Sequence, residues 1–455
     1  MRYYSTRNKN LTVSFAEAAL TGLAPDGGLF VPEEIPKYPA AVRSSLGSME
    51  FRDIAFETIK PYVHSVITDS ALSDIIDSAF TFTAPAVFVS DRYSVELFHG
   101  PTAAFKDFGA RFMARAFSHL RRSEDRPLRI LVATSGDTGG AVADGFFNVQ
   151  GINVTVLYPQ GRVTPLQERQ IAGLGENISA VAVKGSFDDC QRLVKAALSD
   201  EGLKKRMSLS SANSINISRL IPQAVYYSSA AGKMFDGRID IDGEATPRIS
   251  KSKEQINLQK NRPVILCVPS GNFGNLTAGL YAMKMGAPVE RFIAATNINK
   301  TFPDYLNSGE YLIRISQATI SNAMDVGAPS NFERMSAHFS WDEMKRIILG
   351  VSVSDDETRE TIRHIHKQCG YFLDPHSAVG WKGANKLIAE NKIESSAAIG
   401  ILGTAHPAKF SEVVEPLAGS PPAPLTLSKA MERTVNAKTI PAEVPALFEI
   451  LNELN

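Results

Sequence analysis

Residues 263–280 read PVILCVPSGNFGNLTAGL. The stretch starts as an apolar run with β-branched residues, passes through a turn of serine, glycine and asparagine, and ends in an apolar helical pattern. The same alternation recurs between residues 129 and 300, which is typical of parallel sheets covered by helices. We therefore expect an α/β fold, and its clearest strands are Arg129–Thr134, Asn153–Tyr158, Ile178–Val183, Pro263–Val268 and Arg291–Thr296.

The composition narrows the class of protein. Of the 455 residues, 44% are hydrophobic, which is enough for two or three domains with buried cores. The 48 basic residues balance the 48 acidic ones, so no net field attracts nucleic acid or an anionic membrane surface. The amino-terminal MRYYSTRNKN has no signal-peptide pattern and no run of 18 apolar residues occurs, so we expect no membrane insertion. A small molecule is the expected partner.

Cysteine and histidine spacing gives no sign of a disulfide framework or a metal site. Cys190, Cys267 and Cys369 stand far apart without a C-x-x-C pair, which fits a reducing compartment, and we expect the cytoplasm. His364 and His366 are two residues apart on an expected helix and face different sides, so no metal ion is predicted.

Changes in composition suggest how the chain is divided. Residues 1–85 show mostly helical patterns and a Pro-rich stretch at 25–39, which predicts a separate N-terminal unit. The α/β region is expected over 86–420 and a C-terminal segment over 421–455. Residues 236–262 are mixed in charge and poor in large apolar side chains, so we expect a surface insertion there.

The turn after the strand at 263–268 is suited to a phosphate group. Its residues, Gly271, Asn272, Phe273, Gly274 and Asn275, precede a helix expected from about Leu276, and their backbone N–H groups can converge on a dianion at the positive helix end. The run matches neither the P-loop nor the dinucleotide fingerprint, so a nucleotide is not the natural ligand. The alternative is a tight strand-to-helix turn that binds nothing.

Lys106 lies in the run HGPTAAFKDFG, among small and aromatic residues. Loss of water there favours the neutral amine, which can form a Schiff base with an aldehyde cofactor and later act as a general base. Arginine can do neither, because it stays protonated. The alternative is a solvated side chain or an ion pair with Asp107.

Two further polar segments are candidate binding sites. Ser135, Gly136, Asp137 and Thr138 end the strand at 129–134 and open a helix expected at 140–149, which suits a carboxylate, although Asp137 can also be a simple N-cap. The second segment, SSANSINISRL, combines hydroxyl, amide and guanidinium groups suited to an anion; these belong to Ser211, Asn213, Ser214, Asn216 and Arg219.

Together, the aromatic-flanked lysine, the Ser/Thr/Gly turn and the Gly-Asn-Phe-Gly-Asn loop resemble the fold-type II enzymes that use pyridoxal phosphate. More specifically, the chain resembles the threonine synthase family of bacteria, in motifs that run in the family's order from Tyr3 to Phe410. These are YYSTR, LAPDGGLFVPE, HGPTAAFKDFGARFMAR, ATSGDTG, SANSINISRL, VPSGNFGNLTAGL, FIAATN, SNAMDV and LGTAHPAKF. The resemblance implies a tryptophan synthase β-like fold, with two lobes of mostly parallel sheets covered by helices, plus an N-terminal threonine-synthase unit.

The resemblance implies roles for individual residues. Lys106 would bind the aldehyde of pyridoxal 5'-phosphate, residues 271–275 its phosphate, and Thr404 would lie beside the pyridine nitrogen. The wider fold-type II pattern has asparagine where this chain has Asp137. An aspartate there would be protonated, be turned away, or orient an amine, and the sequence does not choose among these.

The implied reaction converts O-phospho-L-homoserine and water to L-threonine and phosphate by γ-elimination and β-addition. Such an enzyme is a carbon–oxygen lyase of amino-acid biosynthesis that acts on phosphates, with Lys106 as repeated proton carrier. We favour Arg219 for the substrate phosphate, beside Asn213 and Ser214. The alternative makes Asn213 and Asn216 turn and cap residues and places Arg219 on a solvated helix face.

Three other functions stay open at this point. A different fold-type II lyase, such as a threonine or serine dehydratase or a sulfhydrylase, would share Lys106 and the glycine loop. A threonine synthase-like protein without activity would bind pyridoxal phosphate as a sensor or scaffold. A nucleotide-binding module would use only the phosphate loop. The sequence does not decide between a monomer and a homodimer.

Overall fold

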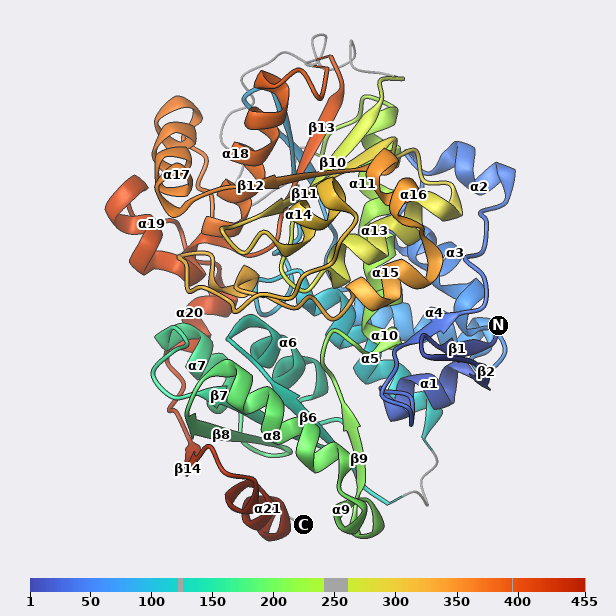
Figure 1. The fold of residues 1–455 in the computed structure, drawn as a ribbon, viewed down its shortest axis with the longest axis vertical. Helices are drawn as coiled ribbons and strands as arrows, with labels where there is room; N and C mark the ends of the chain where they lie inside the picture. Colours follow the sequence, from blue (N-terminus) through green and yellow to red (C-terminus); the bar gives the residue numbers. More distant parts are fainter. Residues whose placement is uncertain (122–125, 241–260, 395, 455) are drawn as a thin grey trace.

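A computed structural model describes residues 1–121, 126–240, 261–394 and 396–454. In Figure 1 the chain forms two lobes, each built around one large sheet. The lower sheet has the strand order β14-β8-β7-β6-β9, and all its pairs are parallel. Its strands are β6 (Leu128–Ala133), β7 (Ile152–Pro159), β8 (Ile178–Lys184), β9 (Ser208–Ser211) and β14 (Ala437–Pro441).

The upper sheet has six strands in the order β12-β11-β10-β13-β5-β4. Neighbouring strands in this sheet are parallel, except that β4 and β5 form an antiparallel pair at one edge. Its strands are β4 (Ala86–Val89), β5 (Arg92–Glu96), β10 (Val264–Pro269), β11 (Arg291–Thr296), β12 (Ile348–Ser352) and β13 (Ala398–Gly403). An α/β fold with mostly parallel sheets is thus confirmed.

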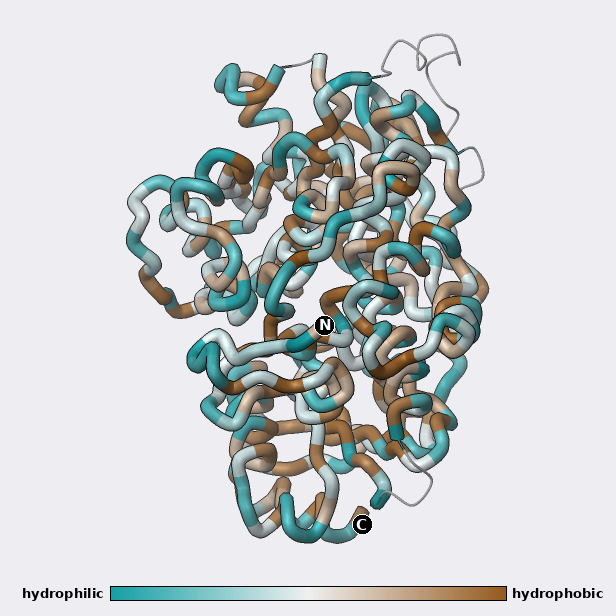
Figure 2. Tube along the Cα trace, turned by 90° about the vertical axis from the view of Figure 1, so that its right-hand side faces the viewer, coloured by the Kyte–Doolittle hydropathy of each residue, from teal (hydrophilic) through white to brown (hydrophobic). Residues whose placement is uncertain are grey.

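Helices cover both faces of each sheet because the central strands bury both sets of side chains. On the upper sheet, α18 (Pro375–Ala389) and α17 (Asp355–Cys369) pack on one side, and α11 (Ala224–Phe235) and α13 (Gly274–Met285) on the other. Alternation along one strand shows this: Ile265 and Cys267 join one core cluster, and Val264, Leu266 and Val268 the other. In Figure 2 many of the hydrophobic stretches of the tube lie in the interior, and many of the hydrophilic stretches lie at the periphery.

The lower sheet is covered in the same way. Helix α8 (Phe187–Ser199) packs on one face with α21 (Val444–Glu453), and α6 (Asp137–Phe146) with α5 (Lys106–Leu120) lies on the other. Helix α7 (Pro165–Ala172) contacts α6. The chain leaves the upper lobe after α19 (Ser411–Ala418) and returns to the lower lobe, where β14 extends the sheet (Figure 1). The predicted C-terminal segment therefore supplies a strand and a helix to the lower lobe.

The N-terminal segment contains a small antiparallel sheet that the sequence patterns did not predict. It is formed by β1 (Tyr3–Ser5), β2 (Asn8–Val13) and β3 (Phe30–Pro32). Strands β1 and β3 have three residues each, and β2 is mostly polar, so none shows a clear apolar alternation. The helices of this segment are α1 (Phe15–Thr21), α2 (Ala40–Ser45), α3 (Phe51–Val63) and α4 (Asp69–Ala79). Its buried side chains belong to the same core cluster as those of α5, α11 and α13. The boundary at residue 85 stays a prediction.

The predicted strands agree closely with the observed ones. Arg291–Thr296 is reproduced, and the strands expected to begin at Arg129 and Pro263 are displaced by one residue. The helix expected at 140–149 begins earlier, at Asp137. Within the expected surface insertion, residues 241–260 lie outside the described part. In the described ranges no helix is both long and apolar enough to cross a bilayer.

The remaining helices are short. They are α9 (Glu201–Arg206), α10 (Ile217–Leu220), η1 (Ile221–Gln223), α14 (Thr301–Ser308), η2 (Asn322–Met324), α15 (Phe332–His338), α16 (Trp341–Ile347), η3 (Pro407–Phe410) and α20 (Leu425–Met431).

Candidate active site

The predicted site residues follow strands of both lobes. In the lower sheet, β6 ends just before the turn at residues 134–137, and in the upper sheet β10 and β13 end before residues 270–275 and Thr404. Carboxyl ends of parallel strands are where α/β proteins place their ligands. The fold therefore directs three of the predicted motifs toward one region between the lobes.

Backbone bonds place Lys106 beside the segment that follows β13. Ala104 forms an isolated bridge with Ala405, the N–H of Phe105 donates to the carbonyl of Thr404 at 2.9 Å, and the N–H of His406 donates to that of Ala103 at 3.0 Å. Lys106 then begins α5. Its position relative to Thr404 is therefore set by main-chain bonds between distant parts of the sequence.

The Lys106 amine lies in a mostly buried, charged environment. Its side chain is 16% exposed, and its Nζ is 3.8 Å from Oδ2 of Asp137. Burial lowers the pKa of Lys106, the nearby carboxylate of Asp137 opposes that shift, and the cations of Lys409 and Arg219 add to it. The pKa shift favours the neutral amine, as the sequence analysis expected.

Asp137 is held from two sides. Its Oδ1 accepts hydrogen bonds from Nζ of Lys409 at 2.8 Å and from Nε2 of Gln167 at 3.0 Å. Burial alone raises the pKa of Asp137, but the ammonium groups of Lys409 and Lys106 outweigh it and keep the pKa below its ordinary value. Gly136, not Asp137, is the N-cap of α6. Asp137 is not turned away from the amine, since its Oδ2 lies 3.8 Å from Nζ of Lys106, and its lowered pKa favours the ionised carboxylate over the protonated one.

Sequence reasoning missed Lys409. The residue lies in η3, and its side chain is fully buried. Besides Asp137, its Nζ donates to the carbonyl of Thr102 at 2.8 Å, four residues before Lys106. A lysine set among apolar residues in LGTAHPAKF was the available signal, the same kind of signal that singled out Lys106.

The glycine-rich turn opens a helix without a side-chain cap. Phe273 is the N-cap of α13 in the left-handed region, at a φ of 59°, and within the described chain no side chain caps this helix end. Its first N–H groups are thus suited to an anion. Asn272 holds the loop in place: its Nδ2 donates to Oγ of Ser214 at 2.5 Å, and its Oδ1 accepts from the N–H of Ser330 at 2.6 Å.

A buried aromatic side chain connects this turn with the lysine helix. The hydroxyl of Tyr226 donates to Oδ1 of Asn275 at 2.6 Å, and that of Tyr227 donates to the same oxygen at 2.7 Å. The ring of Tyr226 packs on that of Phe108, two residues after Lys106, with centroids 5.2 Å apart. Asn275 Nδ2 is buried and has no hydrogen-bond partner among the described residues, so it can donate to a ligand.

The SSANSINISRL segment is divided between structural and candidate binding residues. Asn216 is the N-cap of α10 and also donates to carbonyls of Ala19 and Ser211, so for Asn216 the cap alternative is correct. Arg219 is buried instead of solvated, its Nη1 donates to the carbonyl of Ala212 at 2.5 Å, and burial lowers its pKa to about 10. Within the described ranges, its Nε has no partner, and neither does Oδ1 of Asn213.

The turn after β6 depends on a glycine. Gly136 has a φ of 142°, and a Cβ there would lie 2.4 Å from side-chain atoms of Gln167. Oγ1 of Thr134 accepts the N–H groups of Gly136 and Gly139, at 2.9 and 2.8 Å, which fixes the turn. Ser135 and Thr138 are half-buried in this turn.

Two histidines of the matched motifs make local contacts. His99 Nε2 is 2.7 Å from Oε2 of Glu96, and Nδ1 of His406 accepts the N–H of Ala408 at 3.2 Å. Burial lowers the pKa of His406 to about 4, so that its ring is neutral at neutral pH. A third histidine, His376, pairs with Asp374 through Nδ1 at 2.6 Å.

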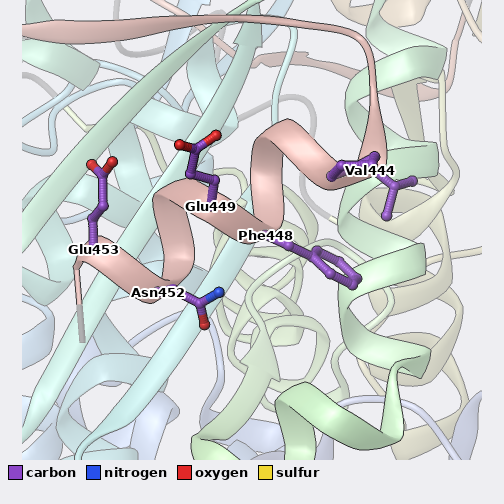
Figure 3. Close-up of a pocket in the computed structure, with 6 residues that line it drawn as sticks. Val444, Phe448, Glu449, Asn452 and Glu453 are labelled. Atoms are coloured by element: carbon purple, nitrogen blue, oxygen red, sulfur yellow. The ribbon is translucent and has the colours of Figure 1, made fainter.

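A surface hollow elsewhere is unrelated to these residues. Figure 3 shows it on α21, where the lining side chains, including Val444, Phe448, Glu449 and Asn452, all come from that one helix. No residue proposed from the sequence lines it.

Comparison with known proteins defines the class. The family model described as "Pyridoxal-phosphate dependent enzyme" matches residues 95–404. The models "Threonine synthase N terminus" and "Threonine synthase, C-terminal" match residues 2–80 and 377–450. With its two sheets and buried lysine, the chain is a pyridoxal-phosphate-dependent enzyme of fold type II.

Relatives identify the family within that class. The chain is 40% identical to the threonine synthase of Escherichia coli over 456 residues, covering 100% of this chain and 99% of that protein. It is 40% identical to that of Haemophilus influenzae, covering 94% of each. It therefore belongs to the threonine synthase family.

Solved structures agree with this result over the whole chain. The crystal structure of the Escherichia coli threonine synthase matches with a TM-score of 0.87 and 38% identity, covering 100% of both chains. A pyridoxal-phosphate-bound threonine synthase from Brucella melitensis matches with a TM-score of 0.86 and 33% identity, covering 100% and 99%. A tomato threonine deaminase, at 16% identity and a TM-score of 0.53, shares the fold alone.

Proposed function

We propose that this chain converts O-phospho-L-homoserine and water to L-threonine and phosphate, as a pyridoxal-phosphate-dependent lyase of threonine biosynthesis. The observation that carries the proposal is the buried Lys106 amine, 3.8 Å from the Asp137 carboxylate, in a chain that matches threonine synthases from end to end. The dehydratase and the nucleotide-binding module are less well supported, because neither accounts for that full-length match. The inactive binding protein is less well supported because Lys106 and Thr404 are both present.

The residues present fit the cofactor. Lys106 would hold its aldehyde carbon, the residues from Gly271 to Asn275 its phosphate, and Thr404 the ring nitrogen. The uncapped start of α13 and the unpartnered Nδ2 of Asn275 are the donors that a phosphate dianion needs. When bound, pyridoxal phosphate withdraws electrons from the amino acid and so makes its C–H bonds acidic.

Lys106 would move the protons of the reaction. Its Nζ would take the proton from Cα of the substrate, give that proton up, and, as a neutral amine again, take a proton from Cβ, so that phosphate leaves from Cγ. Water would then add at Cβ, and the amine would return protons to the carbon atoms. A base with a lowered pKa suits this work, because it is neutral in a larger share of molecules at neutral pH.

Two clusters would hold the substrate. The N–H and hydroxyl groups of Ser135, Gly136 and Thr138, with Asp137 beside them, would face the amino-acid end. Arg219, with Asn213 and Ser214, would face the phosphate, because a buried guanidinium with an unpartnered Nε is a strong donor for an anion.

The product assay tests this function. Purified, cofactor-loaded protein incubated with O-phospho-L-homoserine should release threonine and phosphate in equal amounts. Release of phosphate together with a keto acid would instead support the dehydratase-like lyase. Absence of any product, with cofactor bound, would support the inactive binding protein.

Location and assembly are further expectations. All three cysteines are free, which supports a reducing compartment, and we expect the cytoplasm. We expect a monomer or a homodimer, which sedimentation of the purified chain would distinguish.

A further inference from the structure

The two carboxylate oxygens of Asp137 have different neighbours. Oδ1 accepts from Lys409 and Gln167, at 2.8 and 3.0 Å. Oδ2 lies 3.8 Å from Nζ of Lys106. One oxygen is therefore anchored by two donors, while the other is directed to the amine that the proposed function uses as its base.

Burying the Lys409 ammonium group costs free energy, because the group loses its contacts with water. Its side chain has no exposed surface, and a buried ammonium is tolerated only where a charge and hydrogen-bond acceptors compensate for lost water. Asp137 and the carbonyl of Thr102 supply that compensation. The same ammonium thus joins α6, η3 and the loop that precedes Lys106.

We propose that Lys409 is a positioning residue for Lys106. It neutralises and fixes Asp137, so that the carboxylate orients the Lys106 amine through Oδ2 without drawing a proton onto it. The inference rests on the proposed function, because Lys106 is the base of that reaction and Lys409 is assigned to position it.

The charges that face Lys106 come from four elements. Asp137 on α6 and Asp107 on α5 raise the pKa of Lys106, whereas Lys409 on η3 and Arg219 on α10 lower it, in addition to the effect of burial. His376 on α18 faces Asp137 from a further side.

Asp107 does not compete for the amine. Its carboxylate is occupied by Thr102, which donates through its N–H at 2.9 Å and its Oγ1 at 2.5 Å. Removing the charge of Lys409 therefore leaves Asp137 as an uncompensated carboxylate next to Lys106, and the pKa of the amine must rise.

The test titrates the amine directly in cofactor-free protein. A limiting amount of an amine-acylating reagent, applied across a pH series, modifies Lys106 in proportion to its neutral form, and mass spectrometry of the Lys106 peptide reads the extent. We expect Lys409→Met to move this titration upward by about one to three pH units. In the cofactor-loaded enzyme, the acid limb of kcat should move in the same direction.

Three comparison variants make the test specific. In Asp137→Asn the titration should move downward, because Lys409 is then an uncompensated cation. In the double variant Asp137→Asn/Lys409→Met, the midpoint pH of Lys106 labelling should lie between those of the two single variants. Lys392→Met, on an exposed lysine that pairs with Glu390, should titrate like the unchanged protein.

An unchanged or lowered titration in folded Lys409→Met would overturn the proposal. If Lys409→Met does not fold, Asp137→Asn decides by itself, since an unchanged titration there also overturns it. Labelling needs no substrate, so this result can fail while the product assay succeeds, and the reverse also holds.

Discussion

Lys106 and Lys409 show how burial and partners set the charge of a single residue. The pKa of Lys106 is lowered because burial outweighs the opposing effect of the Asp137 carboxylate, whose Oδ2 is 3.8 Å from Nζ. Lys409 lies at hydrogen-bond distance from the same carboxylate. The difference of about 1 Å between the two contacts separates a candidate base from a structural cation.

Replacing Lys106 by alanine should abolish the reaction. With no amine to carry protons, threonine and phosphate formation should fall by at least about 10²-fold. Phosphate release from O-phospho-L-homoserine measures this. Cofactor should still bind weakly through the loop at residues 271–275, which equilibrium dialysis detects. Activity close to that of the unchanged protein would refute the assigned role.

Arg219 should act mainly on substrate binding. Arg219→Met removes a buried cation from the phosphate site, so KM for O-phospho-L-homoserine should rise about tenfold or more, with a smaller change in kcat. Inorganic phosphate should also inhibit less strongly. Arg219→Lys keeps the charge but not the planar guanidinium, so its KM should lie between those of the unchanged protein and Arg219→Met. An unchanged KM in Arg219→Met would remove Arg219 from the site.

Among the elements, the start of α6 most directly positions a functional side chain. Gly136 is the N-cap, and Thr134 accepts two N–H groups of the turn, so Asp137 enters the first turn facing Lys409. The capping box of α7, formed by Thr164 and Gln167, brings the Gln167 side chain to the same carboxylate. A side chain of α7 thus donates a hydrogen bond to the Oδ1 atom of Asp137 on α6.

Gly136→Ala should destabilise the protein and disturb the site. A Cβ there would meet the Gln167 side chain at 2.4 Å, and the φ of 142° is accessible mainly to glycine. We expect a loss of about 2–4 kcal/mol in the free energy of unfolding, measured with urea. Gly175→Ala is the matched control, since Gly175 has a φ of 70° and no atom within 4 Å of its Cβ position. Equal losses in both variants would contradict the predicted clash.

For the whole molecule, Arg334 links parts that are far apart in the chain. Its buried guanidinium donates to the carbonyl of Phe30 in β3, to the carbonyl of Ile215 and to Oδ1 of Asn331. Asn331 in turn donates to the carbonyl of Asn272 in the glycine-rich turn after β10 at 3.1 Å. The N-terminal sheet is thereby connected to the upper lobe.

Arg334→Met should loosen this connection. Two buried acceptors and one part-buried acceptor would lose this donor, at a cost of about 2–5 kcal/mol in the free energy of unfolding. The variant should also bind pyridoxal phosphate more weakly, which dialysis of the folded protein measures. Exposed Arg359→Met, which removes a surface ion pair with Asp356, should change neither quantity. Unfolding of Arg334→Met at the same urea concentration as the unchanged protein would contradict the prediction.

The sequence by itself determined the α/β class, five strands of the two large sheets (β6, β7, β8, β10 and β11), and the motifs around Lys106, Gly271 and Asp137. Those features are local: hydrophobic periodicity and turn residues depend on neighbours in the chain. The small N-terminal sheet escaped detection because its three-residue strands β1 and β3 carry almost no periodicity and its six-residue strand β2 is mostly polar. Only the tertiary structure decided that Asp137 pairs with Lys409, and that Asn216 is a cap while Arg219 is buried. These outcomes depend on burial and on charges brought together from distant segments, and no local pattern encodes them.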